Sequence, residues 1–342
     1  MKQMKVKLED VCERGTSNLK QSDIAKTSGD YPIYGASGYI GNTNFYHQEK
    51  PYVAVVKDGA GVGRAALYPA NSSVIGTMQY LLPKDNVLPK YLFYVVSYMH
   101  LEKYYTGATI PHIYFKDYKN EEFNLDLLER QAEIVEILEK CEKIIEKRKQ
   151  EIQLLDDIIK ARFVEMFGDV KYGTERWGGK PFKDITINLD SKRKPVKDAD
   201  RKKMQGIYPY YGATGIVDYV NDYRQDGEFL LISEDGKALE LRSKPIAFLT
   251  SGKIWVNNHA HVQQCTDECN MVYLMYHINF MDISIWVTGI DQKKLNRANL
   301  DTIPIALPPI ELQEQFADFV NQVTKSKLLE FSSLQNHTGM LQ

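Results

Sequence analysis

The chain has 342 residues, with 43 Lys and Arg against 45 Asp and Glu, so its net charge is −2. This length is enough for two domains that each bury a core. An apolar run of about 18 residues is missing, which argues against a membrane-spanning helix, and the opening MKQMKVKLEDV lacks the apolar centre of a signal peptide. We therefore expect a cytoplasmic protein. The near-neutral charge argues weakly against a DNA-binding protein that works alone.

Residues 1–126 have the pattern of a small module of strands with one helix. Runs rich in Val, Leu and Tyr, separated by glycine-rich turns at 35–38 and 58–63, predict strands. The predicted strands are 52–57, 65–68 and 78–83. Apolar residues within 88–105 predict a short helix that packs on the sheet.

Residues 127–167 contain no Gly and no Pro, and their apolar residues alternate three and four positions apart. This spacing is typical of a helix in a coiled coil. At 1.5 Å per residue the helix is about 60 Å long. Ordinary helices average about 11–12 residues, so we favour a spacer between two globular parts over a helix in an ordinary core. Gly168 is expected to end the helix, and its narrow apolar stripe needs a second helix.

A second module and a second helix follow. Strands are expected at 228–232, 245–249 and 260–264. Pro308 and Pro309 suit the first turn of a helix, which we expect to run to about Gln335 with Phe316 and Val320 on its apolar face. This helix is predicted to be shorter than the first, about 27 residues against about 40.

The chain repeats itself. The sequence 31–38, YPIYGASG, returns at 208–215 as YPYYGATG, with six of eight residues identical and an offset of 177. Thr106-Gly107 is echoed by Thr288-Gly289, and 124–131 by 306–313, both with an offset of 182. Order and spacing are kept over about 100 residues, which indicates a duplicated unit rather than a common turn motif.

We therefore expect a mixed α+β fold of two similar domains, each a twisted β-sheet with small helices. Two long antiparallel coiled-coil helices with pseudo-two-fold symmetry would separate them. The predicted boundaries are 1–126 for the first domain, 127–168 for the first helix, 169–307 for the second domain and 308–342 for the second helix.

Motifs of catalysis are missing. The glycine-rich stretch 58–63 lacks the G-x-G-x-x-G register and precedes a predicted strand rather than a helix, so a nucleotide site is not favoured. The sequence has no G-x4-G-K-[ST], G-x-S-x-G or H-E-x-x-H motif, and no Asn-Pro-Pro-Tyr tetrapeptide of amino-methyltransferases. We predict no catalytic residues in this chain.

A metal site is also not expected. Cys265 and Cys269 are three residues apart, and His259 and His261 lie just before them. A further Cys/His pair at zinc-finger spacing does not follow. We interpret the two histidines as structural residues with hydrogen-bonded rings.

Binding of DNA has more support. Residues 183–203 carry eight basic and four acidic side chains, although a solvated loop is an equally good interpretation. Tyr, Asn, Gln, Lys and Arg stand beside glycines in the loops, and these side chains reach base edges and phosphates. Two modules on a long spacer suit two half-sites, which lie about 34–36 Å apart on one face of B-DNA.

The chain resembles the DNA specificity subunit of type I restriction-modification systems over almost its whole length. The repeated module-plus-helix order carries the resemblance together with five segments, which are 31–38, 208–215, 256–262 (VNNHAHV), 307–316 (LPPIELQEQF) and 163–169 (FVEMFGD). The resemblance implies that each module is a target-recognition domain reading one half of a split, asymmetric site on double-stranded DNA. It implies that the helices set the gap and dock two modification subunits.

The same resemblance places the chemistry on partners. The modification (methyltransferase) subunits would carry S-adenosylmethionine and methylate adenine, and the restriction subunits would bring ATP, Mg and the nuclease. The chain itself would need no cofactor. The alternatives are a coiled-coil scaffold that does not read DNA, an anti-restriction decoy, or a stand-alone methyltransferase, which would have to bind the cofactor by itself.

Candidate DNA-contacting residues come from basic side chains in loops, although plain surface charge would explain them too. In the first module they are Lys57, Arg64 and His112. In the second they are Lys192, Arg193, Lys194, Lys237 and Arg242. Residues 57–59 and 234–236 occupy similar places in the two modules, which predicts a shared loop.

Overall fold

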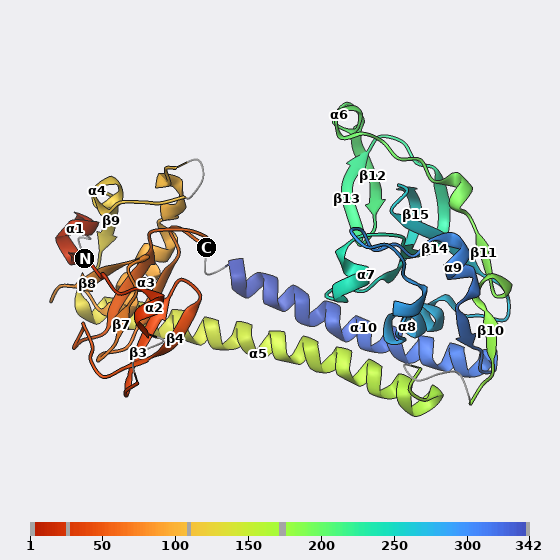
Figure 1. Cartoon of the computed structure of the whole chain (residues 1–342), viewed down its shortest axis with the longest axis horizontal. Helices are drawn as coiled ribbons and strands as arrows, with labels where there is room; N and C mark the ends of the chain where they lie inside the picture. Colours follow the sequence, from red (N-terminus) through yellow and green to blue (C-terminus); the bar gives the residue numbers. More distant parts are fainter. Residues whose placement is uncertain (1–3, 25–27, 108–110, 171–175, 340–342) are drawn as a thin grey trace. The chain divides into compact units, whose positions relative to one another are not determined.

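A computed structural model describes residues 4–24, 28–107, 111–170 and 176–339, with side chains described as far as Leu328 (Figure 1). The chain forms two compact units. Unit 1 is Met1–Lys147 with Leu334–Gln342, and unit 2 is Arg148–Ser333. The division falls inside the first long helix, so each unit includes one half of it.

Unit 1 combines three groups of strands with short helices. Its strands are β1 (Met4–Lys7), β2 (Cys12–Gly15), β3 (Tyr31–Gly35), β4 (Gly38–Thr43), β5 (Tyr52–Val56), β6 (Ala65–Tyr68), β7 (Ser73–Val74), β8 (Met78–Pro83) and β9 (Glu122–Leu125). Its helices are α1 (Leu8–Val11), α2 (Gln21–Ile24), α3 (Pro89–Tyr98), η1 (Leu101–Tyr104), α4 (Phe115–Tyr118) and the first half of α5 (Leu128–Phe167).

Unit 2 is built in the same way. Its strands are β10 (Gly179–Pro181), β11 (Thr186–Asn188), β12 (Gln205–Gly212), β13 (Gly215–Val220), β14 (Gln225–Ser233), β15 (Ala247–Val256), β16 (Ala260–Cys265) and β17 (Pro304–Ala306). Its helices are the second half of α5 with η2 (Phe182–Asp184), η3 (Asp190–Lys192), α6 (Asp198–Arg201), α7 (Lys237–Leu241), α8 (Met271–Phe280), η4 (Ser284–Trp286), α9 (Arg297–Thr302) and α10 (Ile310–Gly339), of which the residues from Leu334 are assigned to unit 1.

The sheets of the two units have the same strand order. In unit 1 the order is β2-β8-β5-β6, and in unit 2 it is β11-β16-β14-β15, continued by β12 and β13. The hairpin β3–β4 pairs in parallel with β7, and the hairpin β12–β13 pairs in parallel with β15. The duplication inferred from the sequence is therefore a duplication of topology, and the mixed α+β fold is confirmed.

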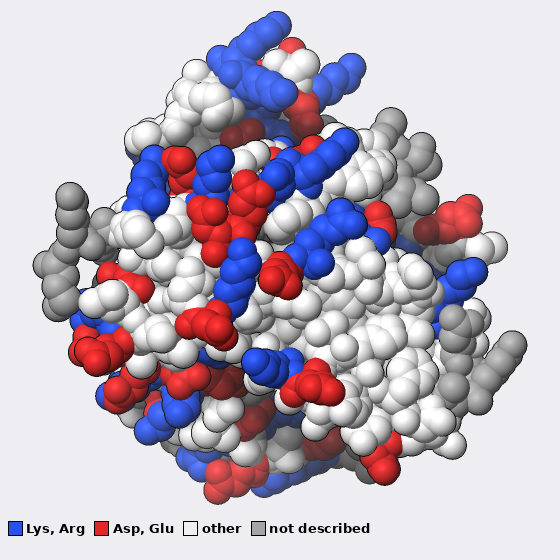
Figure 2. All heavy atoms as spheres, turned by 90° about the vertical axis from the view of Figure 1, so that its left-hand side faces the viewer, with Lys and Arg blue, Asp and Glu red and all other residues white. Residues whose placement is uncertain are grey.

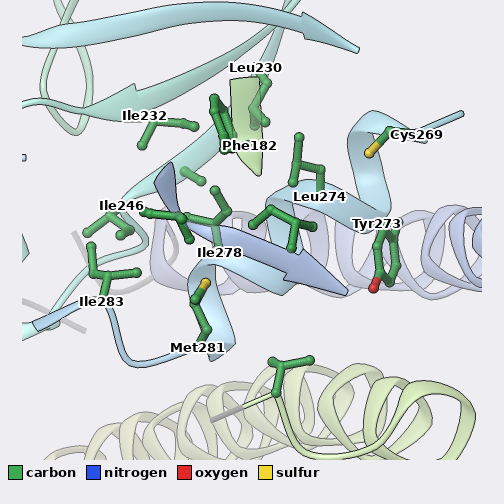
Figure 3. Close-up of a cluster of buried hydrophobic side chains, with 14 of the residues drawn as sticks. Phe182, Leu230, Ile232, Ile246, Cys269, Tyr273, Leu274, Ile278, Met281 and Ile283 are labelled. Atoms are coloured by element: carbon green, nitrogen blue, oxygen red, sulfur yellow. The ribbon is translucent and has the colours of Figure 1, made fainter. Parts of the chain in front are cut away.

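Strand β14 shows why the sheet of unit 2 is buried on both faces. Successive side chains of a strand point to opposite faces. Leu230 and Ile232 enter the cluster shown in Figure 3, which also holds Phe182, Leu274 and Ile278. The alternate residues of β14, Phe229 and Leu231, enter a second cluster. β5 divides its five buried residues between two clusters of unit 1 in the same way.

The long helix follows the sequence prediction closely. α5 ends at Phe167, and Gly168 adopts φ +90°, the left-handed cap that favours glycine. In unit 2 the second half of α5 lies antiparallel to α10, because Asp156 pairs with Lys327 at 2.6 Å and Phe163 meets Phe316 at a ring-centroid distance of 5.3 Å. α10 has 30 residues against 40 for α5, so it is the shorter helix within the described residues.

The helix predicted for 88–105 is divided into α3 and η1. His100 stands between them with φ +50°, which stops the helix. In the described parts of the chain, no helix is long and apolar enough to cross a membrane.

A buried glutamine fastens each long helix to its own unit. The Gln131 amide accepts from Leu88 N at 2.9 Å and donates to the carbonyls of Asn86 and Asp126. Gln313, at the offset of 182, accepts from Asn270 N at 2.9 Å and donates to the carbonyls of Glu268 and Pro308. Both side chains are fully buried, so the first turn of each helix is held by the same set of contacts.

Candidate nucleic-acid interface

The loop after β5 in unit 1 is held by a small set of backbone contacts. Lys57 N donates to Thr77 O at 2.9 Å, and Ile113 N donates to Lys57 O at 2.9 Å. Asp58 forms a β-bridge with His112, and His112 pairs with Thr106 through two backbone hydrogen bonds. We call the residues 57–58, 77, 106 and 112–113 the loop frame of unit 1.

Unit 2 has the same frame after β14. Glu234 N donates to His259 O at 2.9 Å, and Leu295 N donates to Glu234 O at 2.8 Å. Asp235 forms the bridge with Lys294, which pairs with Thr288. The loop frame of unit 2 is therefore residues 234–235, 259, 288 and 294–295, each at the offset of 177 or 182 from its counterpart.

The side chains on the two frames differ. Lys57 is replaced by Glu234, Thr77 by His259 and His112 by Lys294, while Asp58 and Asp235 agree. A common backbone thus presents two different sets of charges and hydrogen-bonding groups.

The repeated glycine turn lies beside the frame in both units. In unit 1 the exposed Arg64 donates from Nη2 to Ala36 O within the β3–β4 turn. In unit 2 Ser233 Oγ, next to the frame, donates to Ala213 O at 2.6 Å in the β12–β13 turn. Gly38 and Gly215 adopt φ of +105° and +134° there, which favours glycine.

The structure brings the three residues nominated in unit 1 together. Lys57 and His112 are half-buried frame residues, and Arg64 pairs through its backbone oxygen with Val56 N, next to Lys57. The His112 ring lies edge-on to Tyr114 at a centroid distance of 4.9 Å. These residues form one basic group on a single loop cluster.

The basic run of unit 2 is more divided. Lys192 and Lys194 are exposed. The backbone of Lys194 is held by two hydrogen bonds, with Lys194 N donating to Val256 O at 3.1 Å and Trp255 Nε1 donating to Lys194 O at 2.7 Å. The Arg193 side chain between them is only 16% exposed, and its Nη1 donates to Glu234 Oε2 at 2.6 Å and to Ala260 O at 3.0 Å. Arg193 therefore supports the frame from inside.

The two residues nominated on α7 also have different surroundings. Lys237 is exposed and follows Gly236, whose φ is +100°. Arg242 donates from Nη2 to three carbonyls at the end of α8, including that of Asn279 at 2.7 Å, and burial lowers the pKa of Arg242. Arg242 thus joins α7 to α8, and Lys237 is the one of this pair that faces water.

His261 has a structural explanation. The ring is 1% exposed, with Nδ1 at 2.7 Å from Asp190 Oδ2 and Nε2 at 2.8 Å from Leu295 O. Burial alone would raise the pKa of Asp190, but hydrogen bonds from His261 and Val262 N and the nearby Arg193 charge outweigh it and lower that pKa. The pair connects β16 to η3, and β16 directly follows the frame residue His259.

Further positive charge lies around α6. Lys197, Lys202 and Lys203 are exposed, whereas Arg201 is held by Asp218 at 2.6 Å. Figure 2 shows Lys and Arg gathered at the top of the view, at the height that Figure 1 gives α6.

The family of the chain follows from its sequence. The family described as "Type I restriction modification DNA specificity domain" matches residues 1–154 and again 175–335. The chain belongs to this family. The two matches also correspond to the two copies of the repeat.

Two curated relatives agree with this assignment. A type I restriction enzyme specificity subunit of Haemophilus influenzae is 37% identical over 145 residues, 42% of this chain and 37% of the relative. The specificity subunit of the EcoprrI type I restriction enzyme of Escherichia coli is 24% identical over 150 residues, 42% of this chain and 36% of the relative. The matches thus span less than half the length of either relative.

Solved structures share the fold across the whole chain. The S subunit of a type I restriction-modification system from M. genitalium aligns with a TM-score of 0.61 at 16% identity and covers 99% of this chain and 94% of its own. A chain from a study of complex assembly and conformational transition of the type I system aligns with a TM-score of 0.54 at 12% identity, covering 99% and 95%.

The shared loop at 57–59 and 234–236 was predicted, but sequence reasoning did not place Thr77 in the frame of unit 1, or His259 and Lys294 in the frame of unit 2. The signal was present in the repeat, because an offset of 182 carries His112 to Lys294 and Thr77 to His259. Their proximity depends on backbone bridges between segments that are distant along the chain, and no local pattern predicts these.

Proposed function

We propose that this chain reads a split, asymmetric site on double-stranded DNA for a type I restriction-modification complex, with one unit for each half of the site. The observation that carries the proposal is the pair of loop frames, which share their backbone contacts and differ in side chains. Reading two unlike sequences with one scaffold requires this combination.

The proposed DNA contacts are the basic side chains that face water at the frames and beside them. They are Lys57, Arg64 and His112 in unit 1, and Lys192, Lys194 and Lys237 in unit 2. Arg193 and Arg242 support these loops through intramolecular hydrogen bonds. Each basic side chain that meets a phosphate is expected to change the salt dependence of binding.

The partners in this proposal are two modification subunits, which methylate adenine with S-adenosylmethionine, and restriction subunits, which use ATP and Mg. α5 supports it, because its exposed apolar residues are available for docking. They are Ile137, Ile144, Leu154, Ile158 and Val164. Catalysis then belongs to the partners, and this chain supplies position and sequence choice.

The test is co-expression with the modification subunit, followed by selection from a random DNA pool with and without that partner. We expect one motif in two halves with a constant gap, and methylation of adenine in both halves. Lys57→Ala and Arg64→Ala should weaken selection of one half. Lys50→Ala is the matched control, because Lys50 is exposed and precedes β5, whereas Lys57 follows it.

Two outcomes would contradict the proposal. A stable complex that enriches no motif would indicate an anti-restriction decoy. Failure to bind either the modification subunit or DNA would leave only a coiled-coil scaffold.

A further inference from the structure

His259 on the frame of unit 2 is held by a buried carboxylate. Its Nδ1 lies 3.0 Å from Asp235 Oδ1 and 2.9 Å from Asp235 Oδ2. The Asp235 side chain is 9% exposed, whereas that of His259 is 46% exposed. The backbone of His259 is fixed as well, since its N–H donates to Asn257 Oδ1 at 2.8 Å. The ring is thus oriented from inside and open to water outside.

The charge of this ring decides what its outer nitrogen can bind. A neutral imidazole that donates from Nδ1 carries a lone pair on Nε2, which repels an anion. A protonated imidazole donates from both nitrogens. Asp235 holds the Nδ1 side of the His259 ring and keeps Nε2 directed away from the carboxylate.

The neighbouring charged groups leave His259 available for an anion. Glu234 is held by Arg193 at 2.6 Å and by Lys294 at 3.5 Å. From β16 and η3, His261 and Asp190 face each other in the interior at 2.7 Å. Asp235 is therefore the acidic group that meets the His259 ring, and it meets Nδ1.

We propose that His259 is a DNA phosphate contact of unit 2 and that Asp235 is its positioning residue. The inference rests on the proposed function, because it takes the loop frame as the DNA-reading surface. The counterpart in unit 1 is Thr77, which carries no charge.

The experiment measures affinity of the complex with its modification subunit for the selected duplex, by fluorescence anisotropy over a series of salt concentrations. His259→Gln should lose roughly tenfold in affinity, as expected for one charged hydrogen bond. Its slope of log K against log salt should fall by about 0.9, the value for one phosphate contact.

Three further variants separate this role from a structural one. His259→Lys keeps a positively charged donor at this position, so its affinity and salt slope should stay close to those of the unaltered complex. Asp235→Asn should lower the affinity by less than His259→Gln does, because the ring keeps a hydrogen-bond partner at Nδ1. Lys50→Ala, at an exposed residue outside the loop frames, is the matched control and should change neither quantity.

The outcomes are distinct. If His259→Gln keeps the affinity and the salt slope of the unaltered complex, and the complex still selects its motif, this inference is wrong and the proposed function stands. If the unaltered complex selects no motif, the proposed function fails and the inference fails with it.

Discussion

Because of His277 on α8, we expect the free energy of unfolding of unit 2 to fall in acid. The side chain is fully buried, its Nε2 accepts from Ala306 N at 3.1 Å, and the ring lies near Phe163 and Tyr273. Burial lowers the pKa of His277 to about 3. A proton on this ring would place a charge inside an aromatic core, so the folded unit keeps the ring neutral.

The sign and size of the effect follow from linkage. An unfolded histidine has a pKa of about 6.5, so between about pH 6.5 and pH 3 the unfolded chain binds a proton that the folded unit does not. The free energy of unfolding therefore falls as the pH falls through this window. At 1.36 kcal/mol per pH unit, unit 2 should lose about 2 kcal/mol between pH 6.5 and pH 5 through this group.

The assay is urea unfolding followed by tryptophan fluorescence. Trp177, Trp255 and Trp286 are the three tryptophans of the sequence, and all belong to unit 2. His277→Gln retains an oxygen that can accept from Ala306 N and cannot gain a proton in this range. We expect its unfolding free energy to change by about 2 kcal/mol less than that of the unaltered chain between pH 6.5 and pH 5. Equal changes in the two proteins would refute the argument.

Four other substitutions test the packing, the frame and the DNA contacts. Gln313→Ala should lower the free energy of unfolding of unit 2 by about 3 kcal/mol in the same urea assay, because three hydrogen bonds are lost at about 1 kcal/mol each. Phe163→Ala should lower it by about 3–5 kcal/mol, since the buried ring meets those of Phe167, Tyr273, Phe280 and Phe316; a loss below about 1 kcal/mol would mean that α5 does not depend on this contact. Arg193→Ala should lower the melting temperature measured by circular dichroism, because the Asp190 and Glu234 carboxylates, 12% and 15% exposed, lose their guanidinium partner. Arg64→Ala should leave that temperature unchanged and lower the salt slope of DNA binding by about 0.9, and the reverse pattern would exchange the roles given to the two arginines.

The regular elements were predictable where one local pattern dominates. α5 begins one residue from the predicted start because its apolar spacing is uninterrupted. β6 and β8 have the predicted bounds, and β6 follows the glycine-rich turn at 58–63. The break at His100 was not predictable. A Cβ on Gly63 would lie 2.3 Å from Glu102 N, so the loop after β5 presses on η1 from a distant part of the chain.

The candidate site was predictable in its chemistry and less so in its geometry. Loop position and charge nominated Arg193 and Lys192 equally, although one is a buried support and the other is exposed. Arg193 is a support because its side chain pairs with Glu234, which lies 41 residues further along the chain. For Arg242 the decisive carbonyls lie 36 to 39 residues away. The repeat is the one sequence signal that reaches over such distances.

The exposed apolar residues of α5 have a practical consequence for supply of the protein. Ile137, Leu154 and Ile158 are 53%, 59% and 48% exposed. Such residues along one helix promote self-association when no other chain covers them. We therefore expect that protein produced in excess of its partner subunits aggregates or is degraded. The amount of partner subunit then limits how much of this protein remains.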